Sequence, residues 1–365
     1  MIHVFVGTKA QFIKMAPIMQ ELDLRGIIFN FIDSGQHAGL TGELIRQFGL
    51  REPNVFLRTD RTNINAVLQA VWWATKSLSG VIFRRKKVFQ QIFQGEQGVC
   101  LIHGDTLTTL LSLFYAKCCG IRVAHVEAGL RSHDLLSPFP EEIIRRIAMR
   151  YGDILFAPSE WAAENLRKMG YTARAVNVGG NTVADAIRYA RRSTTSKRRP
   201  NKPYVVATTH RMENIYSRSR LTKIATLLER IAKERQVIFV IHEPTQRQLL
   251  RYGLEEKLLR QKSIEMLPLQ SYIEFIDLLA GADFVVTDGG SIQEESYFLN
   301  IPCLIMRNRT ERREGLGQNA FVTGFDEAKI DQFLEKYSSF RRTEVTDDSY
   351  PSRTIVDHLL SLGQP

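Results

Sequence analysis

Three acidic residues in the first half of the chain have the type and the setting for proton transfer. Asp105 follows the apolar run 99–103, Glu127 follows the run 122–126, and Glu141 begins a helical pattern after a proline-rich turn. Because the carboxyl ends of parallel strands meet at one sheet edge, we expect these carboxylates to gather there as an acid/base set acting at carbon. The alternative is structural, since Asp caps helices well and acids suit a helix N-terminus.

Groups suited to binding an anion follow other apolar runs. The stretch from Gly7 to Lys14 opens the first helical pattern, so helix-start amides, Lys9 and Lys14 favour a negative charge there. In the second half, His210 and Arg211 directly follow an apolar run and can hold phosphate. Turns of the first kind are common and a single histidine often has a structural role, so neither feature decides the function by itself.

A glycine-rich turn and an arginine-rich loop complete the candidate set. Residues 289–291, Gly-Gly-Ser, open another helical pattern, and their amides can approach a phosphate. Either Glu294 or Glu295 in that pattern can accept hydrogen bonds from ribose hydroxyls. The arginines of 307–313 can pair with phosphate, with carboxylates of the site or only with water.

Short β-rich runs alternate with helical patterns along the whole chain, which predicts parallel sheets covered on both faces. The predicted strands are 2–6, 27–32, 99–103, 122–126, 153–157, 175–178, 204–208, 237–241, 264–266, 284–287 and 303–306. The predicted helices are 12–24, 107–119, 160–169, 219–234, 272–280, 291–299 and 351–362. The pattern predicts an α/β protein with two doubly wound halves and a ligand held between them.

A polar, basic stretch with two prolines at 191–203 is the best linker candidate. We therefore expect an N-terminal domain over 1–190 that carries the carboxylates and a nucleotide-binding domain over 191–348. A C-terminal helix within 349–365 is expected to cross back to the first domain.

The composition restricts the possible partners and compartment. The chain has 365 residues with 44% hydrophobic and 24% charged residues, and no apolar stretch long enough to span a membrane or to serve as a signal peptide. We expect a cytoplasmic protein with reduced, buried thiols, since none of its four cysteines has metal-ligand spacing. The net charge of +10 suits an anionic substrate, but no nucleic-acid motif accompanies it. The basic clusters at 84–87 and 191–199 are interpreted as solvated faces.

The motifs, taken in order, resemble those of the non-hydrolysing UDP-N-acetylglucosamine 2-epimerases. The segments HGDT, HVEAGLRS and SPFPEE are the most specific, followed by DGGSIQEE and TER, and the resemblance runs from Gly7 to about Glu314. It implies a GT-B-type fold of two Rossmann-like domains facing a central cleft. It further implies a UDP-sugar substrate, no nicotinamide or metal cofactor, a homodimer, and a role in making surface-polysaccharide precursors. The implied reaction eliminates UDP to give a glycal and adds UDP back with inversion at C2.

The resemblance also assigns roles to individual residues. The implied catalytic residues are Asp105, Glu127, Glu141, Lys14 and His210. The implied substrate-binding residues are Phe275 near uracil, Gly289, Gly290 and Ser291 at the phosphates, and Glu295 at the ribose. Lys9 and Arg211 are expected to stabilise the leaving diphosphate, and Arg145 and Arg312 are further substrate-binding candidates.

The chain departs from the family pattern mainly where the nucleotide is expected. The usual GTRPE opening is here GTKAQ, and the usual DSGG turn is here DGGS. A lysine cannot reproduce the bidentate contact of an arginine. Three other functions are compatible with the same residues: a hydrolysing 2-epimerase that releases UDP and free sugar, a GT-B glycosyltransferase, and a non-catalytic nucleotide-sugar binding protein.

Overall fold

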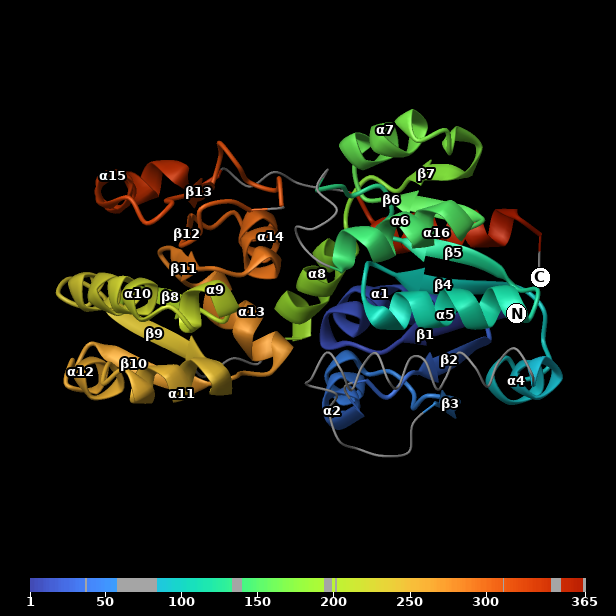
Figure 1. The fold of residues 1–365 in the computed structure, drawn as a ribbon, viewed down its shortest axis with the longest axis horizontal. Coiled ribbons are helices and arrows are strands. Elements are labelled where there is room, and N and C mark those ends of the chain that lie inside the picture. The colour runs from blue at the N-terminus through green and yellow to red at the C-terminus, as the bar shows by residue number, and fades with distance from the viewer. Residues whose placement is uncertain are drawn as a thin grey trace. The chain divides into compact units, whose positions relative to one another are not determined.

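The computed structural model describes residues 1–36, 38–57, 84–132, 140–193, 199–200, 202–310, 312–342 and 349–363. The chain divides into two compact units, which Figure 1 labels by element. Unit 1 comprises Met1–Tyr189 and Asp348–Pro365, and unit 2 comprises Ala190–Asp347. The first three residues of the SPFPEE motif (137–139) and part of the 191–203 linker lie outside the described residues.

Unit 1 contains a seven-stranded parallel sheet in the order β3-β2-β1-β4-β5-β6-β7. Its strands β1, β2, β4 and β6 are buried along their whole length, as a parallel sheet covered on both faces requires. The strands are β1 (Ile2–Val6), β2 (Phe29–Asp33), β3 (Val55–Phe56), β4 (Val99–His103), β5 (Arg122–Val126), β6 (Ile154–Ala157) and β7 (Ala175–Asn177).

Helices cover this sheet, and the last helix of the chain is one of them (Figure 1). Helix α16 packs against α1, where Arg25 pairs with Asp357 at 2.5 Å. The helices are α1 (Lys9–Leu24), α2 (Ala38–Phe48), α4 (Arg85–Ile92), α5 (Leu107–Cys118), α6 (Glu141–Tyr151), α7 (Glu160–Lys168), α8 (Val183–Ser193) and α16 (Pro351–Ser361), with a short 3-10 helix η1 (Thr172–Arg174). The chain passes into unit 2 through α8.

Unit 2 contains a six-stranded parallel sheet in the order β10-β9-β8-β11-β12-β13. Its strands are β8 (Tyr204–Thr208), β9 (Gln236–Ile241), β10 (Ile264–Pro268), β11 (Val285–Thr287), β12 (Cys303–Ile305) and β13 (Ala320–Val322). Its helices are α9 (Met212–Ile215), α10 (Arg218–Ile231), α11 (Glu243–Arg251), α12 (Glu255–Leu259), α13 (Tyr272–Ala280), α14 (Gly290–Phe298) and α15 (Glu327–Lys336), with η2 (Tyr337–Phe340). The prediction of two doubly wound halves is confirmed.

Both sheets reverse their strand order at one place, between β1 and β4 in unit 1 and between β8 and β11 in unit 2. Ligands of open α/β sheets bind beside such a switch point, at the carboxyl ends of the strands. Five of the candidate residues identified from the sequence lie in the loops after β4, β5, β8 and β11, namely Asp105, Glu127, His210, Arg211 and Gly289.

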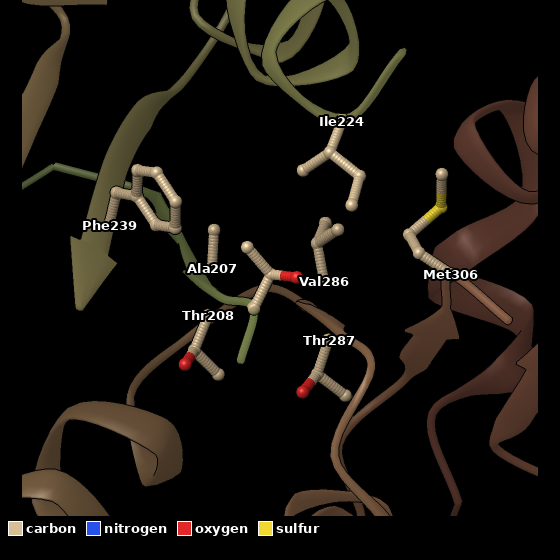
Figure 2. A pocket seen from close by; sticks show the side chains of 8 residues that line it. Ala207, Thr208, Ile224, Phe239, Val286, Thr287 and Met306 are labelled. Atoms are coloured by element: carbon tan, nitrogen blue, oxygen red, sulfur yellow. The ribbon is translucent and has the colours of Figure 1, made fainter. Parts of the chain in front are cut away.

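A narrow pocket in unit 2 is part of the hydrophobic core and not a ligand site. Figure 2 shows Ile224 of α10 facing side chains of the sheet across it. The gap leaves no room for a water molecule, and five of its lining residues belong to the core cluster of the unit. Those five residues are Ala207, Ile224, Phe239, Val286 and Met306.

Within the described residues, no helix is long and apolar enough to cross a membrane. All four cysteines are unpaired thiols; Cys100, Cys119 and Cys303 are buried, whereas Cys118 is only half-buried. The prediction of buried thiols is therefore correct for three of the four. The basic side chains of 84–87 are exposed, in agreement with a solvated face.

Candidate functional site

Glu127 has an unusual backbone conformation directly after β5. Its φ angle is +66°, in the left-handed region that non-glycine residues rarely adopt. This backbone conformation costs about 1–3 kcal/mol of folding free energy, and it persists only where the surrounding structure holds the residue in place. Its carboxylate is buried, and Oε1 accepts hydrogen bonds from Lys14 Nζ at 2.5 Å and Asn181 Nδ2 at 2.6 Å. These two hydrogen bonds can hold Glu127 in its strained backbone conformation.

Lys14 reaches Glu127 because the first turn of α1 is fixed to the end of β4. Thr8 and Gln11 form a capping box at the start of α1. The Gln11 amide also donates to the carbonyl of His103 at 2.8 Å. Lys14 lies one turn further along α1 and is only 5% exposed, so its ammonium requires the carboxylate that it contacts. This chain has GTKAQ where GTRPE is usual, and the glutamine of that segment, Gln11, anchors the start of α1 to the end of β4.

Asp105 lies after β4 and pairs with Arg145 of α6. It does not cap helix α5, because Thr106 occupies the cap position and forms a capping box with Thr109. The capping role considered for Asp105 from the sequence is therefore wrong. In the described part of the chain, Asp105 makes its ion pair with Arg145 and not with Lys14.

Glu142 is the centre of a second buried ion network. Its carboxylate is fully buried and accepts from Arg131 Nε at 2.5 Å, Ser132 N at 3.0 Å and Arg145 Nη1 at 2.8 Å. Burial alone would raise the pKa of Glu142, but the hydrogen bonds from Ser132 and Arg131 and the charge of Arg145 outweigh burial and lower it. Glu142 therefore fixes the guanidinium that holds Asp105.

The adjacent acid, Glu141, is in a different environment. It is the first residue of α6 and is half-buried. Its Oε2 atom is buried and has no hydrogen-bond partner among the described residues. A buried acceptor without a partner costs free energy unless a ligand or a proton satisfies it. The two neighbouring glutamates therefore differ in the structure: the carboxylate of Glu142 is fully paired, whereas Glu141 keeps one buried oxygen without a hydrogen-bond partner among the described residues.

His125 of β5 lies among these charged groups. Its Nε2 contacts the carbonyl of Gly104 at 2.7 Å, and burial lowers the pKa of His125 to about 4. The charges of Glu127 and Arg145 act on its pKa in opposite directions, so both ion pairs lie close to this ring. His125 is consequently neutral at pH 7.

In unit 2, Asp288 after β11 organises the loop that follows β8. It is fully buried, and its two oxygens accept from the amides of His210 at 2.9 Å and Arg211 at 3.1 Å. The side chains of Thr209 and Asn214 donate to it as well, the latter at 3.0 Å. Four neutral donors therefore hold this carboxylate, whereas Glu127 and Glu142 of unit 1 each accept from a charged side chain as well as from a neutral donor.

Gly289 and His210 lie in close contact. A Cβ atom at position 289 would lie 2.7 Å from His210 Cε1, so a larger residue would displace the imidazole. The ring also lies 4.8 Å from that of His242. Burial lowers the pKa of His210, and the nearby charge of Asp288 opposes this effect. The structure thus brings together two residues of the expected phosphate site.

Helix α14 presents the remaining turn and acids. Gly289 is its N-cap, Gly290 its first residue, and Ser291 is exposed. Such a start can accept an anion. In the helix, Glu295 is buried, and Glu294 lies 3.5 Å from Arg312 Nη1, so this arginine pairs with a carboxylate.

Gln293 fixes the arginine-rich loop onto α14. Its amide donates to the carbonyls of Arg312 at 3.2 Å and Glu314 at 2.8 Å, and it accepts from Thr310 Oγ1 at 2.7 Å. Two other predicted residues, Lys9 at the start of α1 and Phe275 on α13, are half-buried.

Sequence reasoning missed Asn181, Glu142 and Gln293 as parts of the site. Glu142 and Gln293 stand inside quoted motifs, but only the folded chain shows which acid or amide of each motif is buried. Asn181 precedes α8, a helix that was not predicted, so its position was not recognised. Among the described residues, no group of three or more His, Cys, Asp or Glu side chains could hold a metal ion.

The chain is similar to known proteins along nearly its whole length. A model of the family described as UDP-N-acetylglucosamine 2-epimerase matches residues 21–352. A UDP-N-acetylglucosamine 2-epimerase of Methanococcus maripaludis is 32% identical over 349 residues, which cover 92% of this chain and 91% of the relative.

Solved structures agree with the sequence relatives. The UDP-GlcNAc 2-epimerase of Methanocaldococcus jannaschii in complex with UDP-GlcNAc and UDP is 28% identical, with a TM-score of 0.81 and 99% of each chain covered. The Neisseria meningitidis enzyme bound to UDP-GlcNAc is 26% identical, with a TM-score of 0.82 and the same coverage. The two parallel sheets therefore form the GT-B-like fold of these enzymes. With that fold and a family match over most of its length, the chain belongs to the UDP-N-acetylglucosamine 2-epimerase family.

Proposed function

We propose that this protein interconverts UDP-2-acetamido-hexoses of the UDP-GlcNAc and UDP-ManNAc type without net hydrolysis. A base removes the C2 proton, the C1–O bond to UDP breaks with its electron pair leaving on UDP, and a C1=C2 glycal forms. A UDP oxygen then adds back to C1 while a proton is delivered to the opposite face of C2. The observation that carries this proposal is the strained Glu127, held by Lys14 and Asn181.

Unit 1 supports the proton transfers. Asp105, Glu127 and Glu141 are the proposed acid/base groups, and Lys14 holds Glu127. The buried oxygen of Glu141 has no hydrogen-bond partner in the described structure, which suits a group that meets a substrate proton. Arg145 is already engaged by Asp105 and Glu142, so we assign it to holding Asp105 beside the sugar.

Unit 2 supports binding of the nucleotide. The α14 start at Gly289, Gly290 and Ser291, together with His210 and Arg211, is the proposed diphosphate site. We assign Glu295 to the ribose and Phe275 to uracil, with Lys9 and Arg312 contributing positive charge. The leaving diphosphate carries negative charge, which these groups can stabilise.

Proton NMR in heavy water tests the reaction. The protein is incubated with UDP-GlcNAc, and the C2 proton, the UDP-ManNAc signals and free UDP are followed together. We expect deuterium at C2 and the second epimer to appear, with free UDP well below stoichiometric amounts. Stoichiometric UDP and free sugar would favour a hydrolysing enzyme, and tight binding without exchange would favour a non-catalytic binding protein. Transfer of the sugar to an added acceptor would favour a glycosyltransferase.

The family resemblance also supports proposals about context. We infer a cytoplasmic homodimer, a two-domain division near residues 190 and 349, and a product used for surface polysaccharides. Light scattering coupled to size-exclusion chromatography tests the dimer, since a monomer mass at working concentration would exclude it.

A further inference from the structure

Asn181 stands between β7 and α8 in unit 1 and is 6% exposed. Both ends of its side-chain amide have defined partners. The oxygen Oδ1 accepts from the amide of Val183 at 3.2 Å, in the first turn of α8. The nitrogen Nδ2 donates to Glu127 Oε1 at 2.6 Å.

These two contacts fix the orientation of the amide. Val183 N is a donor, so it must face the oxygen of Asn181, and an ionised Glu127 accepts only, so it must face the NH2 group. A flipped amide would lose both bonds. The side chain therefore joins the start of a helix to the carboxylate in a single arrangement.

The contact also determines how the carboxylate of Glu127 is turned. Lys14 and Asn181 converge on one oxygen, Oε1. The other oxygen, Oε2, then lies toward His103, with its Nε2 at 3.7 Å, and toward Gly104, where an added Cβ would be 3.5 Å away.

Within the described part of the chain, charged and titratable groups face Glu127 from three elements. They are Lys14 of α1, His103 at the end of β4, and His125 of β5. Asn181 is the neutral member of this set, so it can orient the carboxylate without adding a charge to the site.

We propose that Asn181 is a positioning residue for the C2 proton transfer. By donating to Glu127 Oε1, it keeps the carboxylate turned for reaction in its strained backbone position. This inference rests on the proposed function, because Glu127 is taken as an acid/base group. The chemical feature that matters is a neutral N–H donor at position 181, and not the helix cap that the same side chain provides.

Two variants separate positioning from capping. Asn181→Asp keeps an oxygen for Val183 N, and Asp is as good as Asn at helix starts, but it places an acceptor against Glu127. Asn181→Ala removes both contacts. Asn177→Ala is the matched control, because Asn177 lies in the same unit, is exposed, and pairs with Glu160 instead.

Steady-state and exchange kinetics in heavy water are measured for all three variants from pH 5 to 9. We expect kcat for C2 exchange to fall about 10- to 100-fold in Asn181→Ala, with KM changed less than about threefold. In Asn181→Asp we expect an equal or larger fall, together with an acid limb displaced to higher pH, because a carboxylate that loses a donor and gains a negative neighbour is protonated more easily. The control variant should match the parent.

The outcomes also separate this inference from the proposed function. If the parent exchanges C2 and Asn181→Asp exchanges at the parent rate with the parent pH profile, Asn181 only caps α8 and the inference is overturned. If the parent itself shows no exchange, the proposed function fails. The inference about Asn181 is then tested separately, by ¹³C NMR titration of the glutamate carboxyls. The Glu127 signal, identified by its absence in Glu127→Gln, must titrate at higher pH in both Asn181 variants, and an unchanged midpoint would overturn the inference.

Discussion

The two units hold their central carboxylates by different means. In unit 1, Glu127 and Glu142 are buried against Lys14, Arg131 and Arg145, so charge is balanced by charge. In unit 2, Asp288 is equally buried but bound by backbone amides and neutral side chains. The first arrangement places several charged side chains around one edge of a sheet. The second fixes a loop without committing a cation to it.

This difference suggests a division of tasks between the units. A group that must gain and lose protons benefits from charged neighbours, which can stabilise either state. A site that must hold a diphosphate benefits when the carboxylate that anchors its loop is held by neutral donors, although Arg312 of unit 2 is itself paired with Glu294. The following variants test this contrast, from the largest expected effect to the smallest.

Replacing Glu127 by Gln should have the largest effect on the reaction. The variant keeps the shape of the side chain but removes the charge that Lys14 contacts, so we expect C2 exchange to fall about 10³-fold. Glu141→Gln and Asp105→Asn should also lower C2 exchange, by about 10²-fold each. UDP affinity, measured by calorimetry, should stay within about threefold of the parent value, because the proposed nucleotide contacts, apart from Lys9, lie in unit 2.

The matched control for Glu127→Gln is Glu160→Gln. Glu160 also belongs to unit 1 and pairs with a cation, Arg167, but its side chain is 69% exposed. This variant should exchange at the parent rate. Exchange at the parent rate by all three acid variants would show that these carboxylates do not perform the proton transfer.

Much of the fold followed from the sequence, because parallel strands buried on both faces give continuous apolar runs. Strands β1, β4, β5 and β8 were predicted with their observed bounds. Strand β2 begins two residues later than predicted, because Ile28, although apolar, is 79% exposed. Helices α8 and α11 are among those that were not predicted; both carry several charged residues, although α8 also has buried apolar residues at helical spacing, Val183, Ile187 and Ala190.

The sequence allowed the candidate residues of the site to be recognised, but not the residues that each of them contacts. The acids and the glycine turn could be recognised because they follow apolar runs. The pairing of Lys14 with Glu127 and of Arg145 with Asp105 joins segments that are far apart in the chain, so spacing alone does not reveal it. Likewise, only packing decides that Glu142 is fully buried while its neighbour Glu141 keeps an oxygen without a partner.

The second prediction compares the charged and neutral networks directly through Glu142→Gln and Asp288→Asn. Loss of the Glu142 charge leaves Arg131 and Arg145 in a buried site with one acid fewer, so we expect the free energy of unfolding to fall by about 3–5 kcal/mol. The Asp288 variant leaves no buried cation uncompensated, and an amide oxygen can still accept from some of its donors. We expect a smaller loss of about 1–3 kcal/mol.

Urea unfolding at pH 7 measures both values, and Glu160→Gln again serves as the control. If Asp288→Asn were the more destabilising of the two, the contrast between a charge-balanced and a neutral network would be wrong.

The third prediction concerns the contact between Gly289 and His210 in unit 2. In Gly289→Ala, the added methyl would displace the imidazole, so UDP affinity should fall about tenfold, equal to loss of a single hydrogen bond to a charged group. His210→Ala should give a similar loss, and the double variant should lose little more, because both changes remove the same contact. Calorimetric titration with UDP measures all three.

Gly42→Ala is the matched glycine control. Gly42 lies within α2, and among the described residues an added Cβ there would meet nothing closer than Arg46 Nη1 at 3.8 Å. This variant should bind UDP as the parent does. Parent affinity in Gly289→Ala would remove this glycine from the phosphate site.

The smallest expected effect is a pH dependence of stability that arises from His125 in unit 1. Its pKa is about 4 in the folded protein because of burial, against an ordinary value of about 6.5 in the unfolded chain. Between these values the unfolded state binds the proton and the folded state does not. The contribution of His125 is therefore fully present above about pH 6.5 and is lost as the pH falls toward 4.

Between pH 7 and 5.5, this linkage should lower the free energy of unfolding by about 1 kcal/mol. His125→Gln should remove that part of the pH dependence, whereas His210→Ala should change it less, because the side chain of His210 is 34% exposed and solvent moderates the cost of its charge. The buried His3 has a similarly low pKa, but it is present in every variant, so the difference between parent and His125→Gln isolates one residue. Identical pH profiles for the parent and His125→Gln would mean that water reaches the ring, and that the charged groups of unit 1 are less enclosed than their burial indicates.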